Sequence, residues 1–467
     1  MIKKLFQIIA LILVVLLSLR LRLDKYSQIP IPGQSVDEYS YSWVGLSLLT
    51  TGMPIGNSGI SGYENQINKY INIDRYMEVI PSDPFAINFP WMDHPPLMGL
   101  ITGSFAKLKG AISFEDTSTV FIRKPVIYLS TLSVILVIVY CWLNFSYVTA
   151  LFAGLAYGTT PLVVLSGRMI QAENGIIPCL LLVMIALSLY LKNKRDYWLI
   201  IAAIFSGIAT LFKLTGVMCY LLTFFTLLNH YRKFKGNFVK DYLFYLFISL
   251  PISFLFVIYG LSYGAQNFVN IFFSNSNRFY GIGPDAILEL IRNQRLTHRK
   301  FLPETPLIFG WLSFFIFLYK NPKLNSIKIP VYAIVSYLII YLLFGSQPYG
   351  WYTFPFWPLL IILLSALITS IFSLSQNNIV ISLIFSISLL GSNISRLLGI
   401  FEFQPYANIW RFFTSVSILV FQALFILKKQ NNLFAKIFLI ILWLAIFYTN
   451  YLYLSKVDIN FWWHNIS

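Results

Sequence analysis

The feature that most constrains this chain is a series of apolar segments, each near the ~20 residues that a helix needs to cross a bilayer. These segments are Leu5–Leu19, Pro125–Leu143, Val148–Leu165, Ile176–Leu191, Trp198–Phe212, Thr215–Leu228, Tyr242–Leu261, Thr305–Leu318, Ile329–Phe344, Phe354–Phe372, Ile379–Ser392, Phe412–Leu427 and Leu433–Tyr453. Hydrophobic residues make up 57% of the chain and charged residues only 11%, against roughly 45–50% and about 25% in soluble proteins. We therefore exclude a soluble multidomain protein. The sequence predicts an all-α polytopic membrane protein, a single membrane-embedded domain over 1–467 with about 13 transmembrane helices.

The distribution of basic residues predicts the orientation of these helices. The formal net charge is +16, and short cytoplasmic loops are the usual place for such an excess of Lys and Arg. With a cytoplasmic N-terminus, most of the loop cations fall inside, and the short outer connections hold only Arg168, Lys213, Arg396, Arg411 and Lys456. We therefore expect the N-terminus in the cytoplasm, the C-terminus outside and no nucleic-acid partner.

Two predicted outer segments, 20–124 and 262–304, are too long to be simple connections. Long loops of this kind often carry function. Within the first, the apolar stretch Pro96–Leu108 is only ~13 residues long and follows a Pro-Pro step, which favours an interfacial helix over a span.

The first long segment holds two acidic motifs. In Asp37-Glu38, a carboxylate at the membrane surface could take a proton from a hydroxyl group or bind a divalent ion; a solvated pair or a helix N-cap is the alternative. In Asp93-His94-Pro95-Pro96, the two prolines fix the backbone next to a pair of polar side chains. His94 there could contact a phosphate, a metal or a substrate hydroxyl, or the motif could simply begin a helix. Asp37, Glu38 and Asp93 are also the candidate ligands if a divalent metal is bound.

Three further ionisable residues, Arg168, Glu173 and Lys213, lie on short outer turns of the predicted topology. Ionisable groups this close to hydrocarbon usually face a cavity or pair with one another. Their cations could neutralise a phosphate; snorkelling or structural ion pairs are the alternative.

The second half of the chain adds a basic loop and an aromatic segment. Arg295 and Arg299 belong to a basic run in 262–304 that could grip a lipid phosphate or rest on anionic headgroups. Tyr349 and Tyr352 belong to the aromatic stretch 349–358, which could stack on a sugar or form part of an interfacial aromatic belt. The chain contains no GxxxxGK[ST], HExxH or GxSxG motif, so ATP hydrolysis, zinc proteolysis and nucleophile-elbow hydrolysis lack their usual support.

Taken in order, these motifs resemble a known family. Asp37-Glu38-x-x-Tyr41, His94-Pro95-Pro96-Leu97, the stretch 168–173, Leu211-Phe212-Lys213-Leu214-Thr215-Gly216 and Tyr352-x-x-Pro355-x-x-Pro358 are similar to features of the GT-C glycosyltransferases, of the protein O-mannosyltransferase and lipid A aminoarabinose transferase kind.

The resemblance implies a GT-C fold and a membrane glycosyltransferase that moves a single sugar, with inversion, from a polyprenyl-phosphate donor to an outward-facing lipid, glycan or protein. It implies Asp37 as the catalytic carboxylate with Glu38 in support. It also implies that Asp93 and His94 line the donor pocket and that Arg168 and Lys213 contact the leaving lipid phosphate. Together with residues singled out above, the predicted substrate-binding set is Asp93, His94, Arg168, Glu173, Lys213, Arg295, Arg299, Tyr349 and Tyr352.

Location and the rival function follow from the same features. The loop 262–304 is too short for the soluble insertion of the eukaryotic mannosyltransferases, so we expect a prokaryotic plasma membrane with the active site on the outer face. The alternative function is a transporter or flippase of a lipid-linked saccharide, which would place charges near the middle of the spans.

Overall fold

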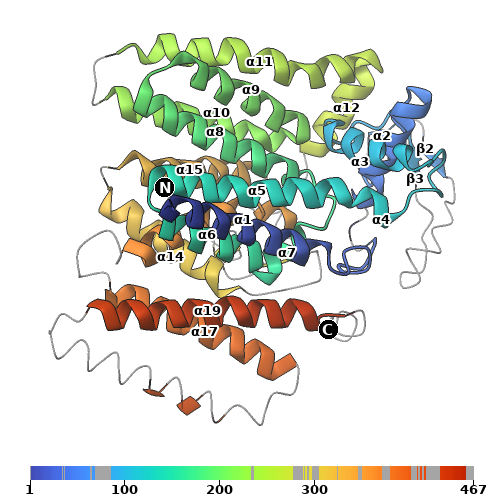
Figure 1. Cartoon of the computed structure of the whole chain (residues 1–467). Coiled ribbons are helices and arrows are strands. Elements are labelled where there is room, and N and C mark those ends of the chain that lie inside the picture. The colour runs from blue at the N-terminus through green and yellow to red at the C-terminus, as the bar shows by residue number, and fades with distance from the viewer. Residues whose placement is uncertain are drawn as a thin grey trace.

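The computed structural model is a bundle of helices that lie side by side, with a smaller group of elements at one end (Figure 1). The structure describes residues 2–33, 35, 37–60, 62–63, 66–68, 86–232, 236–276, 288, 290–291, 294–296, 304–322, 324–344, 350–370, 379–400, 408, 411–412, 415–416 and 432–458. The helices in the bundle are α1 (Ile2–Leu23), α5 (Lys124–Asn144), α6 (Tyr147–Thr159), α7 (Pro161–Ser166), α8 (Glu173–Asn193), α9 (Asp196–Phe212), α10 (Met218–Tyr231), α11 (Phe238–Ser262), α14 (Thr305–Lys320), α15 (Asn325–Phe344), α16 (Phe356–Thr369), α17 (Ile379–Ile400) and α19 (Asn432–Lys456).

Seven helical segments of the described chain are long and apolar enough to cross a membrane. They lie at α1, α4 (Thr119–Ile122) together with α5, α8, α11, α15, the 3₁₀ helix η2 (Gly350–Thr353) together with α16, and α19. Most of the other predicted spans coincide with shorter helices, such as the 17-residue α9 and the 16-residue α14, and the predicted span Phe412–Leu427 lies mostly outside the described residues. A polytopic membrane protein is confirmed, whereas the count of about 13 spans stays a prediction.

Burial separates the central helices from the peripheral ones. In the most apolar window of each helix, 94% of the η2–α16 residues are buried, against 17% in α1 and 22% in α11. A helix that is apolar on all sides and buried belongs to the centre of a bundle. The exposed apolar side chains of α1 and α11, including Phe6 and Phe247, therefore face the place where lipid would lie.

One end of the bundle carries α2 (Asp37–Thr51), α3 (Leu97–Leu108), α4 (Thr119–Ile122) and α12 (Ala265–Ser276) (Figure 1). A Cβ on Gly45 of α2 would lie 1.7 Å from the Gly99 carbonyl oxygen of α3, and one on Gly103 would lie 2.3 Å from the Leu46 nitrogen. Only glycine allows the two backbones to approach this closely. The predicted helix after the Pro-Pro step is confirmed as α3, with 12 residues, and its interfacial position stays a prediction.

The same end holds a three-stranded antiparallel sheet that the all-α prediction missed. Its order is β1 (Gly56–Asn57), β3 (Ala86–Asn88), β2 (Gln66–Asn68), with Gly56 opposite Asn88 and Ile67 opposite Ile87. Strands of two or three residues are too short to give a period-2 pattern in the sequence. The predicted second loop also begins with a helix, α12.

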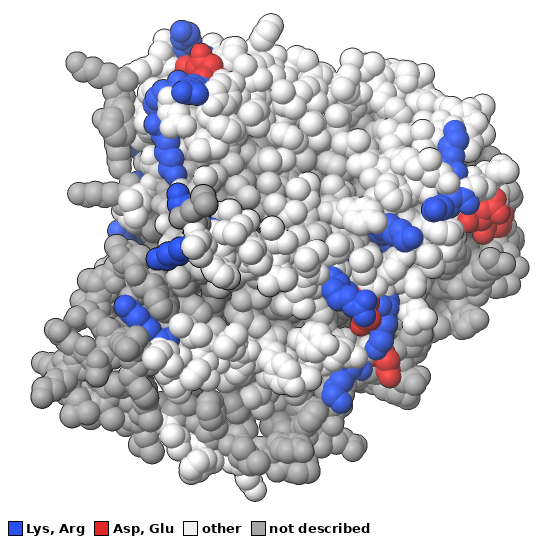
Figure 2. Space-filling view, in the orientation of Figure 1, with Lys and Arg blue, Asp and Glu red and all other residues white. Residues whose placement is uncertain are grey.

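The charged side chains lie mainly at the two ends of the bundle. On the face in Figure 2, Lys, Arg, Asp and Glu gather at the two ends of the helices and leave an uncharged band between them. Helix α1 begins at the end opposite to α2 and α3 (Figure 1). The first long loop and the start of the chain therefore lie at opposite ends, and the assignment of one end to the cytoplasm stays a prediction.

Candidate functional site

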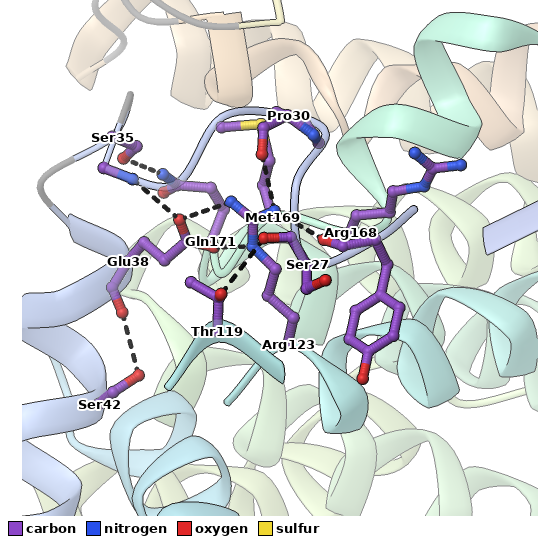
Figure 3. A network of polar contacts seen from close by, with 12 residues as sticks. Ser27, Pro30, Ser35, Glu38, Ser42, Thr119, Arg123, Arg168, Met169 and Gln171 are labelled. Atoms are coloured by element: carbon purple, nitrogen blue, oxygen red, sulfur yellow. Dashed lines mark hydrogen bonds and ion pairs between the residues drawn. The ribbon is translucent and has the colours of Figure 1, made fainter. Parts of the chain in front are cut away.

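Asp37 and Glu38 form the first turn of α2, where the partial positive charge of a helix N-terminus stabilises carboxylates. Glu38 is buried and paired with Arg123, whose Nε lies 2.6 Å from Oε1 and whose Nη2 lies 2.8 Å from Oε2 (Figure 3). Arg123 Nη1 also donates to the carbonyl oxygens of Tyr26 and Pro30, each at 2.7 Å. Arg123 thus ties the segment before α2 to the first turn of that helix, and Asp37 is held in place next to this joint.

Arg168 lies in the turn between α7 and α8, and its side chain contacts both the end of α1 and the segment that follows it. Its Nη1 donates to the Ile29 carbonyl at 2.9 Å and its Nη2 to the Leu21 carbonyl at 2.6 Å. From the same turn, Gln171 Nε2 donates to Ser35 Oγ at 2.5 Å. Two buried arginines therefore fix the path of the chain from α1 to α2, and both terminal nitrogens of Arg168 are used on the backbone.

Glu173 and Lys213 form a second buried ion pair. Glu173 is the first residue of α8, and Lys213 follows α9 just before the 3₁₀ helix η1 (Leu214–Val217). Lys213 Nζ lies 2.6 Å from Glu173 Oε1, and the two side chains are 6% and 0% exposed. The ammonium also lies 3.9 Å from the centre of the Tyr352 ring, a cation–π contact that adds stability in a desolvated place. Three predicted site residues from distant parts of the sequence therefore meet.

Asp93 is held by side chains of the sheet region. Its Oδ2 accepts from Ser58 Oγ and its Oδ1 from Tyr63 Oη, both at 2.5 Å. Its carbonyl oxygen accepts from Asn275 Nδ2 of α12 at 2.8 Å. The loop before α3 is thus anchored to both the sheet region and α12.

His94 lies within an aromatic group. Its ring stacks on Tyr41 of α2, with centres 5.7 Å apart and planes inclined by 21°, and meets the edge of Trp91 at 6.1 Å. The Pro-Pro step that follows His94 leads directly into α3. His94 is therefore positioned against the same helix that begins with Asp37.

The charges of these groups act on one another, because several of them lie close together at this end of the bundle. Burial, followed by the charges of Asp37, Glu173, Tyr352 and Asp93, holds the pKa of Tyr41 well above its ordinary value. Burial alone would lower the pKa of Lys213, but Glu173, Tyr352 and Asp37 raise it above its ordinary value, so Lys213 is a cation at neutral pH.

The second predicted loop contacts this site through the backbone of Arg295. A Cβ on Gly350, the first residue of the 3₁₀ helix η2 (Gly350–Thr353), would lie 2.1 Å from the Arg295 carbonyl oxygen. Arg295 thus packs against the short helix that carries Tyr352. Arg299 and Tyr349, also predicted for the site, lie outside the described residues.

The three carboxylates proposed as metal ligands do not form a cluster suited to a metal. No group of three or more His, Cys, Asp and Glu within the described ranges lies close enough to hold an ion. Glu38 spends both of its oxygens on Arg123 and Asp93 spends both on hydroxyl groups.

Sequence reasoning missed two ion pairs between an arginine and a buried glutamate. Arg123 lies 85 residues from Glu38, and its only sequence signal is a charge directly before a long apolar run. The second pair joins Glu304, at the N-cap of α14, to Arg396 of α17 through two contacts of 2.9 Å. Glu304 Oε1 also accepts from the Leu162 backbone nitrogen at 3.2 Å, so it joins three helices.

Comparison with known proteins agrees with this fold. A family model described as dolichyl-phosphate-mannose-protein mannosyltransferase matches residues 93–259. This stretch includes Asp93, His94, Arg168, Glu173 and Lys213 and omits Asp37. No curated protein sequence matches the chain.

Among solved structures, the chain has the fold of the GT-C membrane glycosyltransferases, and the resemblance expected from the sequence is confirmed. It is similar to ArnT from Cupriavidus metallidurans in the apo state, with a TM-score of 0.58 and 13% identity over 99% of this chain and 78% of that one. It is also similar to the same protein bound to undecaprenyl phosphate, with a TM-score of 0.54 and 15% identity over 96% and 76%. At these identities the likeness defines the fold, and substrates need a separate argument.

Proposed function

We propose that this protein is a membrane glycosyltransferase that moves one sugar from a polyprenyl-phosphate donor to an acceptor on the outer face of a prokaryotic plasma membrane, with inversion. The observation that carries the proposal is the meeting of Asp37, His94, Lys213 and Tyr352 at one end of a GT-C bundle. Two comparisons support the donor: ArnT, which has a similar fold, is known in a structure bound to undecaprenyl phosphate, and the matched family model is described as a dolichyl-phosphate-mannose-protein mannosyltransferase.

The chemistry follows from the two kinds of charge in the site. The acceptor oxygen attacks the anomeric carbon on the side opposite to the phosphate and forms the new C–O bond. The bond between the anomeric carbon and the phosphate oxygen breaks, and the departing polyprenyl phosphate keeps the electron pair. The proton of the acceptor passes to the Asp37 carboxylate, which acts as the general base. Attack from the opposite side inverts the configuration of the sugar.

Lys213 is the group that we assign to the leaving phosphate. Negative charge grows on the phosphate as the glycosidic bond breaks, and a cation in a nearly dry place stabilises that charge more than one in water. Lys213 is 95% buried, remains charged and lies beside an aromatic ring. His94 lines the donor pocket, with its ring held by Tyr41.

Glu38, Arg123, Arg168 and Asp93 are positioning residues in this proposal. Their polar atoms are engaged by one another, by the backbone or by hydroxyl groups. They hold Asp37 and His94 at fixed places, which matters because a small misplacement of a catalytic group costs much of its rate.

The test follows a labelled sugar. The purified protein in proteoliposomes is given undecaprenyl phosphate carrying one of several radiolabelled hexoses or pentoses, with a membrane extract of the source organism as acceptor. We expect label to leave the lipid with the wild type and to stay on it with Asp37→Asn. Label that crosses the bilayer while still attached to its lipid would identify a flippase and overturn the proposal.

A further inference from the structure

The Glu173–Lys213 pair contains one polar atom that the fold does not use. Oε1 of Glu173 is fixed by Lys213 at 2.6 Å, and the carboxylate is 0% exposed. Oε2 is buried and accepts no hydrogen bond from any residue in the described part of the chain. A buried carboxylate oxygen without a donor is costly, by about 1–3 kcal/mol or more. Such an atom at a functional site calls for a partner that arrives with the ligand.

The charge of the pair limits what that partner can be. Lys213 already neutralises Glu173, and a second cation next to Glu173 would lie beside the Lys213 ammonium and be repelled by it. Tyr352, half-buried, covers the ammonium with its ring. The group best suited to Oε2 is therefore a neutral donor of a hydrogen bond, such as a hydroxyl group.

The position of the Glu173–Lys213 pair suggests that this hydroxyl group belongs to the donor sugar. This step rests on the proposed function, in which Lys213 contacts the donor phosphate. A lysine ammonium has three donor positions, so one can hold Glu173 while another faces the phosphate. Because Oε2 belongs to the same carboxylate that Lys213 holds, this arrangement would bring it next to the sugar that the phosphate carries, and a hydroxyl group of the sugar ring could then donate to it.

We propose that Glu173 Oε2 accepts a hydrogen bond from a ring hydroxyl of the donor sugar, and that the donor carries a neutral hexose or pentose in place of an aminosugar. Glu173 is then a specificity residue for the sugar, held in place by Lys213.

The test compares lipids with and without a sugar on the full-length protein in nanodiscs. Native mass spectrometry measures binding of undecaprenyl phosphate alone, of undecaprenyl phosphate carrying neutral hexoses or pentoses, and of the same lipid carrying glucosamine. For the wild type we expect a neutral sugar lipid to bind best. For Glu173→Gln we expect the preference for that lipid over bare undecaprenyl phosphate to fall about 10-fold or more. The matched control is Glu115→Gln, an exposed glutamate whose replacement should leave the preference unchanged.

The wild type offers a test that does not depend on a folded variant. Deoxy analogues of the best sugar lipid remove one hydroxyl at a time, and one of them should bind about 10-fold or more weakly. The inference is overturned if every deoxy analogue binds as well as its parent, if the glucosamine lipid binds best, or if a folded Glu173→Gln protein keeps the full preference. A wild type that binds neither bare nor glycosylated lipid would contradict the proposed function itself.

Discussion

Removing Arg123 tests how much the stability of the protein depends on the buried ion pair at the start of α2. In Arg123→Met, the Glu38 carboxylate keeps its buried position, 2% exposed, but loses both contacts with the guanidinium, at 2.6 and 2.8 Å, and among the described residues keeps only the Gly33 backbone nitrogen, at 3.5 Å. Breaking a buried pair by removing one partner costs about 3–5 kcal/mol, because the remaining charge is left without compensation. The carbonyls of Tyr26 and Pro30 lose their donor as well.

The companion variants separate the charge from the packing. Glu38→Gln/Arg123→Met removes both charges, and we expect it to recover much of the lost stability, because a buried pair replaced as a whole often costs little. Arg195→Met is the matched control; Arg195 is exposed at the N-cap of α9, and its replacement should change stability by less than about 0.5 kcal/mol. Thermal unfolding of the purified protein in detergent with added lipid ranks the four proteins.

Activity distinguishes a positioning role of Glu38 from a chemical one. If Glu38 acts only by holding Asp37, sugar transfer should return in the double variant along with stability. A folded double variant without any transfer would assign Glu38 a direct part in the reaction. An Arg123→Met protein as stable as the wild type would refute the reasoning about the buried pair.

Four further predictions follow from the site. Asp37→Asn should lower the transfer rate by about 10²–10⁴ and leave binding of undecaprenyl phosphate intact in native mass spectrometry. Lys213→Met should weaken that binding about 10-fold or more, and unchanged binding would remove Lys213 from the phosphate site. Gly45→Ala should cost about 1–3 kcal/mol in thermal unfolding because its Cβ would meet α3, whereas Gly59→Ala, with open space around it, should cost far less. Burial lowers the pKa of Lys213, but Glu173 and Asp37 raise it by more. The stabilisation that the Lys213 charge gives to the pair is therefore complete below the unfolded pKa of ~10.4 and is lost only as the pH rises through the higher folded pKa. The difference in thermal-unfolding midpoint between the wild type and Glu173→Gln/Lys213→Met should accordingly stay constant from pH 7 to pH 10.

The sequence was informative wherever a signal was local. Long apolar runs predicted the helices, and a short apolar run after two prolines predicted α3. For Glu173 and Lys213 the sequence left two alternatives open, contact with a phosphate or a structural ion pair, because ionisable groups on short turns beside hydrocarbon face a cavity or pair with one another. The structure confirms that pairing at 2.6 Å.

The parts that sequence reasoning missed depend on contacts between distant residues. The Glu38–Arg123 and Glu304–Arg396 pairs join positions 85 and 92 residues apart, and no spacing rule connects such positions in a single sequence. The sheet was missed because two or three residues give no alternation. Arg168 was expected to face a phosphate, since its charge suggested a ligand, whereas its terminal nitrogens contact two backbone carbonyls.

The two buried carboxylates, Glu38 and Glu173, show how similar residues serve different purposes in one site. Arg123 occupies both oxygens of Glu38 with a planar fork, and a fully engaged carboxylate has little left to offer a ligand. Lys213 occupies only one oxygen of Glu173. An arginine therefore suits the pair that shapes the site, and a lysine suits the pair that we propose contacts the substrate.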